Sequence, residues 1–141
     1  MDDAPLVLVV EDNAANADLA ALLLEAQGLR VQVAFDADQA LAALALALPD
    51  LILADIQLPG MDGLALTQRL KGDARTRHVP VIALTAYAMS GDEARMRAAG
   101  CDGYLSKPLD VRTFGAHVAR IANASRGEGG GAAGAPAADS P

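Results

Sequence analysis

The sequence predicts an α/β fold in which five parallel strands form one sheet with helices on both faces. Two observations predict it. Five short apolar segments read as buried strands, and they alternate along the chain with five segments whose apolar residues suit helices. Parallel strands are joined by crossovers, usually helices, and right-handed crossovers place those helices on both faces of the sheet.

Each predicted strand is short and ends where the apolar pattern breaks. The third is the clearest, because four apolar residues run directly into Asp55 and are followed by Pro59, Gly60 and Gly63. The second alternates polar and apolar residues, which is typical of an edge or half-exposed strand. The predicted strands are Leu6–Val10, Arg30–Phe35, Leu51–Asp55, Val81–Leu84 and Gly103–Ser106.

Capping residues and glycine or proline mark the predicted helices. Asn13 can cap the first helix, and Asp36 with Gln39 fits a capping box at the second. A second capping box is formed by Ser90 with Glu93. Glycine and proline then end most helices, because they favour or force a C-terminal stop. We expect helices from Asn13 to Gly28, from Asp36 to Pro49, over Leu64–Leu70, from Ser90 to Gly100 and from Asp110 to about Ala124.

The 141-residue chain is 52% hydrophobic, which is ample material for one core. From Ser125 onward the sequence consists mostly of Gly, Ala, Pro and Ser, with hardly any large apolar residue. Such a composition is typical of a linker or disordered end. We therefore expect one domain over residues 1–124 and a disordered tail or linker over residues 125–141.

Charge and composition exclude several functional classes. The formal charge of -7 argues against direct nucleic-acid binding, which needs a basic face, and favours binding of a divalent cation. The apolar runs are too short to cross a bilayer, and the chain opens with Asp2 and Asp3 in place of a signal sequence, so we expect a soluble cytoplasmic protein that does not contact membranes. Cys101, the single cysteine, is expected to be a small packed residue.

Functional side chains follow four of the predicted strands. They are Glu11 and Asp12, then Asp55, then Thr85, then Lys107. Because the carboxyl ends of parallel strands meet at one edge of the sheet, we expect these groups to converge on one crevice. Three carboxylates so close repel one another, and a bound cation resolves the conflict. Oxygen ligands without His or thiolate select a hard ion, and a shallow site with room for waters favours Mg2+ over Ca2+.

A phosphoryl group is the ligand expected at such a site. Mg2+ bridges phosphoryl oxygens, and Lys107 adds a second positive charge for another oxygen. The carboxylate of Asp55 can then act as the nucleophile and form an aspartyl phosphate.

From Leu6 to Ala124 the sequence resembles the receiver domain of two-component response regulators, because five separate elements match in order. The matching positions are the acid pair Glu11 and Asp12, the phosphoacceptor Asp55, the hydroxyl of Thr85, the switch aromatic Tyr104 and the lysine Lys107. The resemblance implies a doubly wound, flavodoxin-like sheet in strand order 2-1-3-4-5. It also implies a cis peptide bond between Lys107 and Pro108.

The resemblance further implies a ligand set for the metal. Mg2+ would be held by the carboxylates of Asp12 and Asp55 and the backbone carbonyl of Gln57, with Glu11 acting through water. The phosphoryl group would come from a phosphohistidine of a kinase or phosphotransfer protein. Thr85 and Tyr104 would then move and change a protein-binding surface made by the fourth helix, fifth strand and fifth helix.

Two segments, residues 84–92 and 100–108, most resemble receivers of hybrid kinases and single-domain cell-cycle regulators of the DivK type. We expect a signalling switch that catalyses its own phosphorylation and dephosphorylation, not a turnover enzyme. A phosphatase of the haloacid dehalogenase type would carry a second acid at position 57, where this chain has Gln. A flavin or nucleotide carrier would carry a Gly-rich phosphate loop after the first strand.

Other interpretations stay open. The chain could be the receiver portion of a hybrid histidine kinase, or a pseudo-receiver that binds proteins without phosphorylation. Glu11 and Asp12 could merely favour the positive end of the first helix, and Thr85 could be a turn or capping hydroxyl. Tyr104 could be an ordinary half-buried strand residue.

Overall fold

The computed structural model describes residues 4–58, 60–86 and 92–127. Five parallel strands form one sheet in the order β2-β1-β3-β4-β5. The predicted fold class and strand order are thereby confirmed. The alternating strand β2 lies at one edge of the sheet, as its pattern predicts. The strands are β1 (Leu6–Val10), β2 (Arg30–Ala34), β3 (Leu51–Asp55), β4 (Val81–Thr85) and β5 (Gly103–Ser106).

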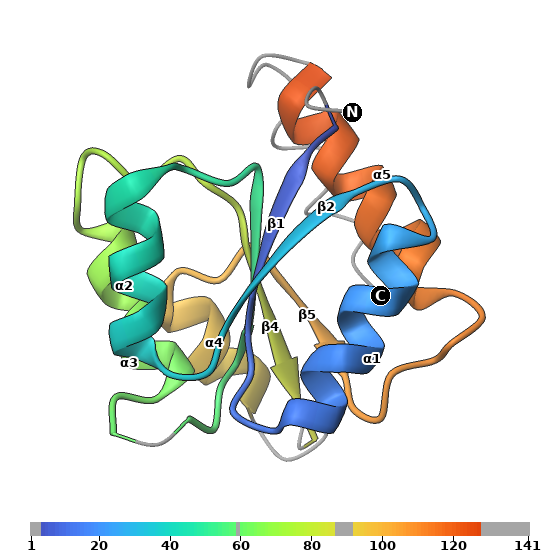
Figure 1. Cartoon of the computed structure of the whole chain (residues 1–141). Coiled ribbons are helices and arrows are strands. Elements are labelled where there is room, and N and C mark those ends of the chain that lie inside the picture. Colours follow the sequence, from blue (N-terminus) through green and yellow to red (C-terminus); the bar gives the residue numbers. More distant parts are fainter. Residues whose placement is uncertain (1–3, 59, 87–91, 128–141) are drawn as a thin grey trace.

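Helices cover both faces of the sheet (Figure 1). α1 and α5 lie together on one face, and α2, α3 and α4 lie on the other side. The helices are α1 (Ala14–Glu25), α2 (Ala37–Leu46), α3 (Gly63–Lys71), α4 (Asp92–Ala99) and α5 (Phe114–Gly127).

The predicted caps explain where α1 and α2 begin. The side chain of Asn13 accepts a hydrogen bond from the backbone N–H of Asn16 at 2.9 Å. The side chain of Asp36 accepts one from Gln39 N–H at 2.8 Å, and Gln39 in turn accepts one from Phe35 N–H at 2.8 Å. Each cap satisfies backbone donors that lack partners within the helix. The proposed cap Ser90 lies outside the described residues.

The core consists of apolar layers on the two faces of the sheet. Alternate residues of β1 point to opposite faces, so that Val7 and Val9 pack with α1 and α5, while Leu8 and Val10 pack with α2 and α3. β3 and β4 are buried along their whole length. These buried central strands fix the edge at which their polar end residues meet.

The last helix differs from expectation at both ends. Asp110 accepts a hydrogen bond from Arg112 N–H at 3.0 Å, but residues 111–113 form a turn, and α5 begins at Phe114. The helix continues to Gly127, three residues beyond the expected end at Ala124. The local bond at Asp110 fits a turn as well as a cap, which is why the sequence misplaces the start. The division into a domain and a tail stays a prediction.

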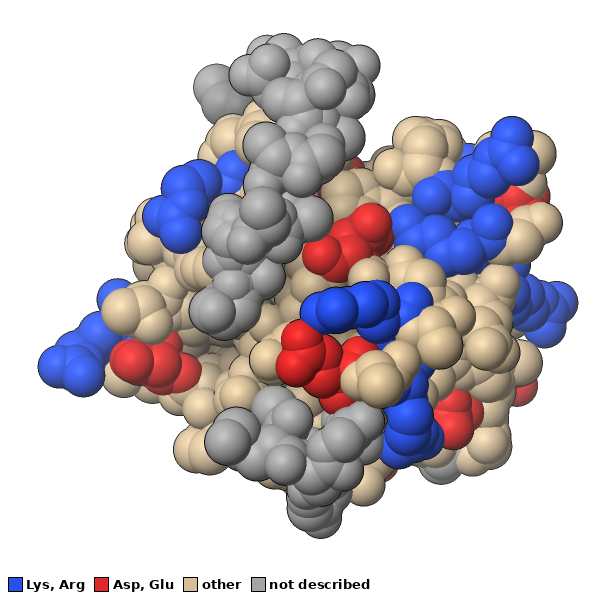
Figure 2. Space-filling view, turned by 180° about the vertical axis from the view of Figure 1, so that it is seen from behind, with Lys and Arg blue, Asp and Glu red and all other residues tan. Residues whose placement is uncertain are grey.

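No helix among the described residues has both the length and the apolar character needed to span a membrane. Seen from behind, groups of Lys and Arg side chains lie beside Asp and Glu side chains (Figure 2). Charges of both signs are therefore interspersed on this face, whereas a nucleic-acid partner would need a continuous basic surface.

Candidate functional site

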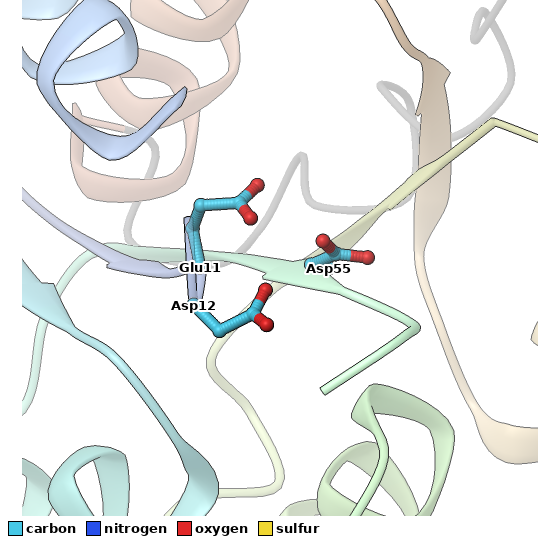
Figure 3. A group of neighbouring side chains, drawn as sticks. All are labelled: Glu11, Asp12 and Asp55. Carbon is cyan, nitrogen blue, oxygen red and sulfur yellow. The ribbon is translucent and has the colours of Figure 1, made fainter. Parts of the chain in front are cut away.

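Three carboxylates meet at the carboxyl ends of two neighbouring strands. Glu11 and Asp12 directly follow β1, and Asp55 ends β3, which pairs with β1 in parallel. The side chains of Glu11 and Asp12 both extend toward Asp55 (Figure 3). One carboxylate oxygen from each residue lies within 4.8 Å of the others. The convergence predicted from the strand ends is therefore present in the structure.

Lys107, which follows the edge strand β5, lies next to two of these carboxylates. Its Nζ lies 2.7 Å from Oδ2 of Asp55 and 3.1 Å from Oε1 of Glu11. It follows β5, which is separated from β3 by β4, and its backbone N–H donates to the carbonyl of Thr85 at 2.8 Å. The peptide bond between Lys107 and Pro108 is cis, as the resemblance implies.

The two buried carboxylates are held by further donors. Glu11 is 2% exposed and Asp55 is 4% exposed. Oδ1 of Asp55 accepts a hydrogen bond from Gln57 N–H at 2.8 Å, and Oε2 of Glu11 accepts one from Asn13 N–H at 3.2 Å. Since each oxygen of Asp55 has a partner, the orientation of its carboxylate is fixed.

Burial and pairing shift two of the ionisable groups. Burial raises the pKa of the Glu11 carboxyl, and the hydrogen bonds from Lys107 and the Asn13 N–H only partly oppose this shift. Burial by itself lowers the pKa of the Lys107 ammonium, but hydrogen bonds to Asp55 and Glu11 outweigh it, so the pKa is raised. Lys107 therefore stays charged at neutral pH.

The set of donor atoms suits a hard divalent cation. Three carboxylates face one ammonium, so negative charge exceeds positive charge within the group. Its ligand atoms are carboxylate oxygens, the type that Mg2+ prefers, and Asp12 is exposed, which leaves room for waters on the ion. The residues present therefore fit the magnesium ion that the sequence predicts.

The other predicted residues lie around this group. Gln57 contributes the backbone N–H described above, and its side chain is exposed. Thr85 is buried at the end of β4, between the strands that carry Asp55 and Lys107. Tyr104 is half-buried in β5 and packs against a separate apolar cluster, not into the ionic group. That cluster consists of Ile56, Leu64, Ala83, Met96 and Ala99.

Two features of the site were missed by the sequence reasoning. A cavity of about 280 Å3 lies beside the ion pairs and is lined by Glu11 and Lys107, by Asn16 of α1 and by apolar residues of β1, α1, β4 and the segment after β5. Gly63 packs directly against the backbone of Asp55. The sequence marks Gly63 only as a break in the pattern and contains no local signal for the cavity.

Comparison with known families decides the identity of this arrangement. Residues 7–119 match the family described as the response regulator receiver domain. The chain belongs to this family. As a receiver domain it is a signalling regulator of two-component systems, not a classical enzyme.

Relatives with known names support a finer likeness. The receiver domain is 48% identical over 108 residues to the polar-differentiation response regulator DivK of Brucella anthropi, covering 77% of this chain and 88% of that protein. It is 50% identical over 111 residues to DivK of Brucella ovis, with the same two coverages. This receiver domain is therefore DivK-like.

Solved structures share the fold. The receiver domain of a signal transduction histidine kinase from Syntrophus aciditrophicus aligns with a TM-score of 0.80 and 33% identity, covering 87% of this chain and 93% of that one. The receiver domain of a sensor histidine kinase from Pseudomonas aeruginosa aligns with a TM-score of 0.76 and 35% identity, covering 88% and 98%. The latter structure has a magnesium ion coordinated in its active-site cleft.

Proposed function

We propose that this receiver domain accepts a phosphoryl group on Asp55 in a Mg2+-dependent reaction and thereby switches a protein-binding surface. One observation carries the proposal: the Asp55 carboxylate lies at the carboxyl edge of the sheet, against the ammonium of Lys107 and beside two further acids. The donor would be a phosphohistidine on a kinase or phosphotransfer protein.

The residues around the cluster would hold the metal. Asp12 and Asp55 would contribute carboxylate oxygens and Gln57 its backbone carbonyl, while Glu11 would act through a water molecule. Bound Mg2+ would supply neutralisation of charge on the phosphoryl oxygens. The magnesium ion in the receiver from Pseudomonas aeruginosa supports this assignment.

Lys107 would bind and orient the phosphoryl group. An ammonium has three N–H donors, and two of them are directed at Asp55 and Glu11. The third can meet a phosphoryl oxygen, so that Lys107 neutralises charge on the group being transferred. The N–H of Gln57 holds the other oxygen of Asp55 and keeps the nucleophile aligned.

Thr85 and Tyr104 would pass the change on. The Thr85 hydroxyl would move toward the phosphoryl oxygens, and Tyr104 would move inward against the cluster that contains Ile56 and Met96. Because Ile56 directly follows Asp55 and Met96 belongs to α4, this cluster joins the site to α4 and β5. The altered surface would comprise α4, β5 and α5.

The decisive experiment compares intact masses after incubation with a small acyl phosphate, with Mg2+ or with a chelator. Wild type with Mg2+ is expected to gain the mass of one phosphoryl group. Asp55→Asn should gain none and keep its fold, because the nucleophile is removed and shape is retained. Asp36→Asn is a matched control, since Asn also caps a helix. Equal labelling of Asp55→Asn and wild type would contradict the proposal.

The same experiment separates the alternatives. A pseudo-receiver would gain no phosphoryl mass from acyl phosphate or from a phosphohistidine donor. The likeness to the two histidine-kinase receivers supports the second candidate, in which this domain is the receiver portion of a hybrid kinase. In that case the phosphoryl group would come from a histidine in the same polypeptide, and the chemistry at Asp55 would be unchanged.

A further inference from the structure

We propose that Gly63 is a positioning residue for the phosphoacceptor, because its missing side chain lets α3 begin in direct contact with the backbone of Asp55. The inference rests on the proposed function of Asp55. Gly63 would touch neither the metal nor the phosphoryl group. It would act through the loop that joins Asp55 to α3.

The contact leaves no room for a methyl group. A Cβ built on Gly63 would overlap the carbonyl oxygen of Asp55 and would lie 2.8 Å from its carbonyl carbon and 2.8 Å from Cα of Ile56. Carbon atoms in favourable contact lie about 3.5–4.0 Å apart. All three neighbours are backbone atoms, which cannot rotate away as a side chain would.

Space is the reason for glycine here, because the backbone of Gly63 does not have a positive φ. Gly60, in the same loop, has φ of 76° and has nothing within 4 Å of a built Cβ. Two glycines of one loop thus serve different needs: Gly60 permits a turn, whereas Gly63 permits a close approach.

Both sides of the contact are anchored. Asp55 lies in β3 opposite Leu84 of β4, and the N–H of Ile56 donates to the carbonyl of Leu84 at 3.1 Å. On the helix side, the buried hydroxyl of Thr67 donates to the carbonyl of Gly63 at 2.8 Å. A side chain at position 63 would therefore displace loop residues between these anchors, among them Ile56, Gln57 and Leu58.

That loop carries Gln57, whose N–H holds Oδ1 of Asp55 at 2.8 Å. The loop is closed by a second bond, from Gly63 N–H to the carbonyl of Ile56 at 3.1 Å. Displacing the loop would change the orientation of the Asp55 carboxylate and the position of the Gln57 carbonyl proposed as a metal ligand. A misplacement of about 1 Å can cost about 100-fold in rate.

Gly115 offers a matched control. A Cβ built there would lie 2.7 Å from the backbone carbonyl oxygen of Leu23 and 3.1 Å from Cγ of Gln27, where α5 packs on α1. Gly115→Ala thus also forces a methyl group against helix backbone, but the affected contact does not involve the loop at Asp55.

The test compares Gly63→Ala with Gly115→Ala and wild type in three measurements. They are the NMR chemical shift and hydrogen exchange of the Gln57 amide in metal-free protein, the Kd for Mg2+ by calorimetry, and the rate of phosphoryl mass gain with acyl phosphate. For Gly63→Ala we expect a shifted, faster-exchanging Gln57 amide, about tenfold weaker Mg2+ binding and a rate about 10- to 100-fold lower. Gly115→Ala should change none of these, even where it lowers stability.

A Gly63→Ala protein that matches wild type in all three measurements would overturn the inference. If Gly63→Ala does not fold, Thr67→Val takes its place, because it removes the bond to Gly63 while keeping the shape; Thr67→Ser, which keeps the hydroxyl, should restore wild-type values. Wild-type values in Thr67→Val would then overturn the inference. Failure of wild type itself to gain a phosphoryl group would instead contradict the proposed function.

Discussion

Two lysines of this domain bind carboxylates at opposite edges of the sheet, and their surroundings differ. Lys107 lies at the carboxyl edge, beside Asp55 and Glu11, with Asp12 close by. Lys71, the last residue of α3, lies near the amino ends of β4 and β5, where its Nζ is 2.9 Å from Oδ2 of Asp102. Both pairs are partly shielded from solvent. At the carboxyl edge, however, the negative charges of the carboxylates exceed the single positive charge of Lys107.

All three N–H groups of the Lys71 ammonium have acceptors. Its ammonium donates to Asp102 and to the carbonyls of Arg77 and Val79 at 2.9–3.1 Å, so its three N–H groups have three acceptors. Oδ2 of Asp102 also accepts from Val81 N–H at 2.8 Å. One positive charge meets one carboxylate, and this edge therefore serves stability.

Lys107 lies in a group in which carboxylates outnumber ammonium groups. Two of its donors are directed at the carboxylates of Glu11 and Asp55, and a third carboxylate, that of Asp12, belongs to the same group. An ion pair alone therefore does not mark a functional site. At the carboxyl edge three carboxylates outnumber one ammonium, and this surplus of negative charge distinguishes it from the amino edge, where one ammonium meets one carboxylate.

The largest expected effect is on phosphoryl transfer in Lys107→Met. Removing the ammonium should lower the rate of phosphoryl mass gain by about 100- to 1,000-fold, the usual effect of losing one preorganised charge-stabilising donor. A time course of intact mass with acyl phosphate and saturating Mg2+ measures it. A rate within threefold of wild type would mean that the carboxyl edge does not depend on its lysine and would break the contrast with Lys71.

Asp12→Asn tests the surplus of negative charge. In wild type, Mg2+ at about 100 times its Kd should raise the free energy of unfolding by ~2.7 kcal/mol. The variant should lose most of this increment, and its metal-free stability should rise slightly, because removing the Asp12 charge relieves repulsion among the three carboxylates. Urea unfolding with Mg2+ and with a chelator measures both quantities, and Asp102→Asn serves as the control at the other edge. An undiminished increment in Asp12→Asn would contradict the metal assignment.

Lys71→Met should act on stability alone. It removes the shared donor of the Arg77 and Val79 carbonyls and of one carboxylate, and because water can replace it at the exposed partners, the free energy of unfolding should fall by about 0.5–1.5 kcal/mol. Urea unfolding measures this loss, and the acyl phosphate assay should give a wild-type rate. A slowed phosphorylation in folded Lys71→Met would show that the two edges are coupled.

The smallest effect concerns Cys101, next to Asp102 at the amino edge. Burial is the main cause that raises the pKa of its thiol, and Asp102 adds to the shift. As pH rises, the thiol ionises in the unfolded chain before it ionises in the folded protein. The contribution of Cys101 to stability is therefore fully present below the ordinary thiol pKa of about 8.5, and it is lost as pH rises through the pKa of the folded state. Between pH 7 and 10 wild type should lose slightly more stability than Cys101→Ala; parallel curves would contradict the shift.

Much of this fold follows from local patterns in the sequence. Runs of apolar residues that end in Asp12 or Asp55 mark buried strands and the edge where they end, and Asn13 and Asp36 cap their helices as predicted. That the acids and Lys107 lie at one edge follows from the parallel topology, and their nearness along that edge follows from the strand order implied by the resemblance. The chemical roles of these residues stay proposals, as do the movements of Thr85 and Tyr104.

Other features depend on tertiary packing and leave no local pattern. Lys71 and Asp102 are 31 residues apart and each resembles a solvated charge in the sequence. Their pairing depends on where the end of α3 meets the start of β5. Gly63 resembles any loop glycine, because a sequence does not distinguish a glycine needed for its φ from one needed for its size. Its close contact with Asp55 emerges only from the packed structure.

The ion pair between Lys107 and Asp55 joins residues 52 positions apart, and Lys107 follows the strand that pairs, among the described strands, only with β4. During translation, Glu11, Asp12 and Asp55 are synthesised well before Lys107. Until β5 is synthesised and seated, the acids would face each other without their counter-charge, and keeping them ionised in a closed sheet would be costly. Competence for signalling should therefore arise in one late step of biosynthesis, when the fifth strand docks.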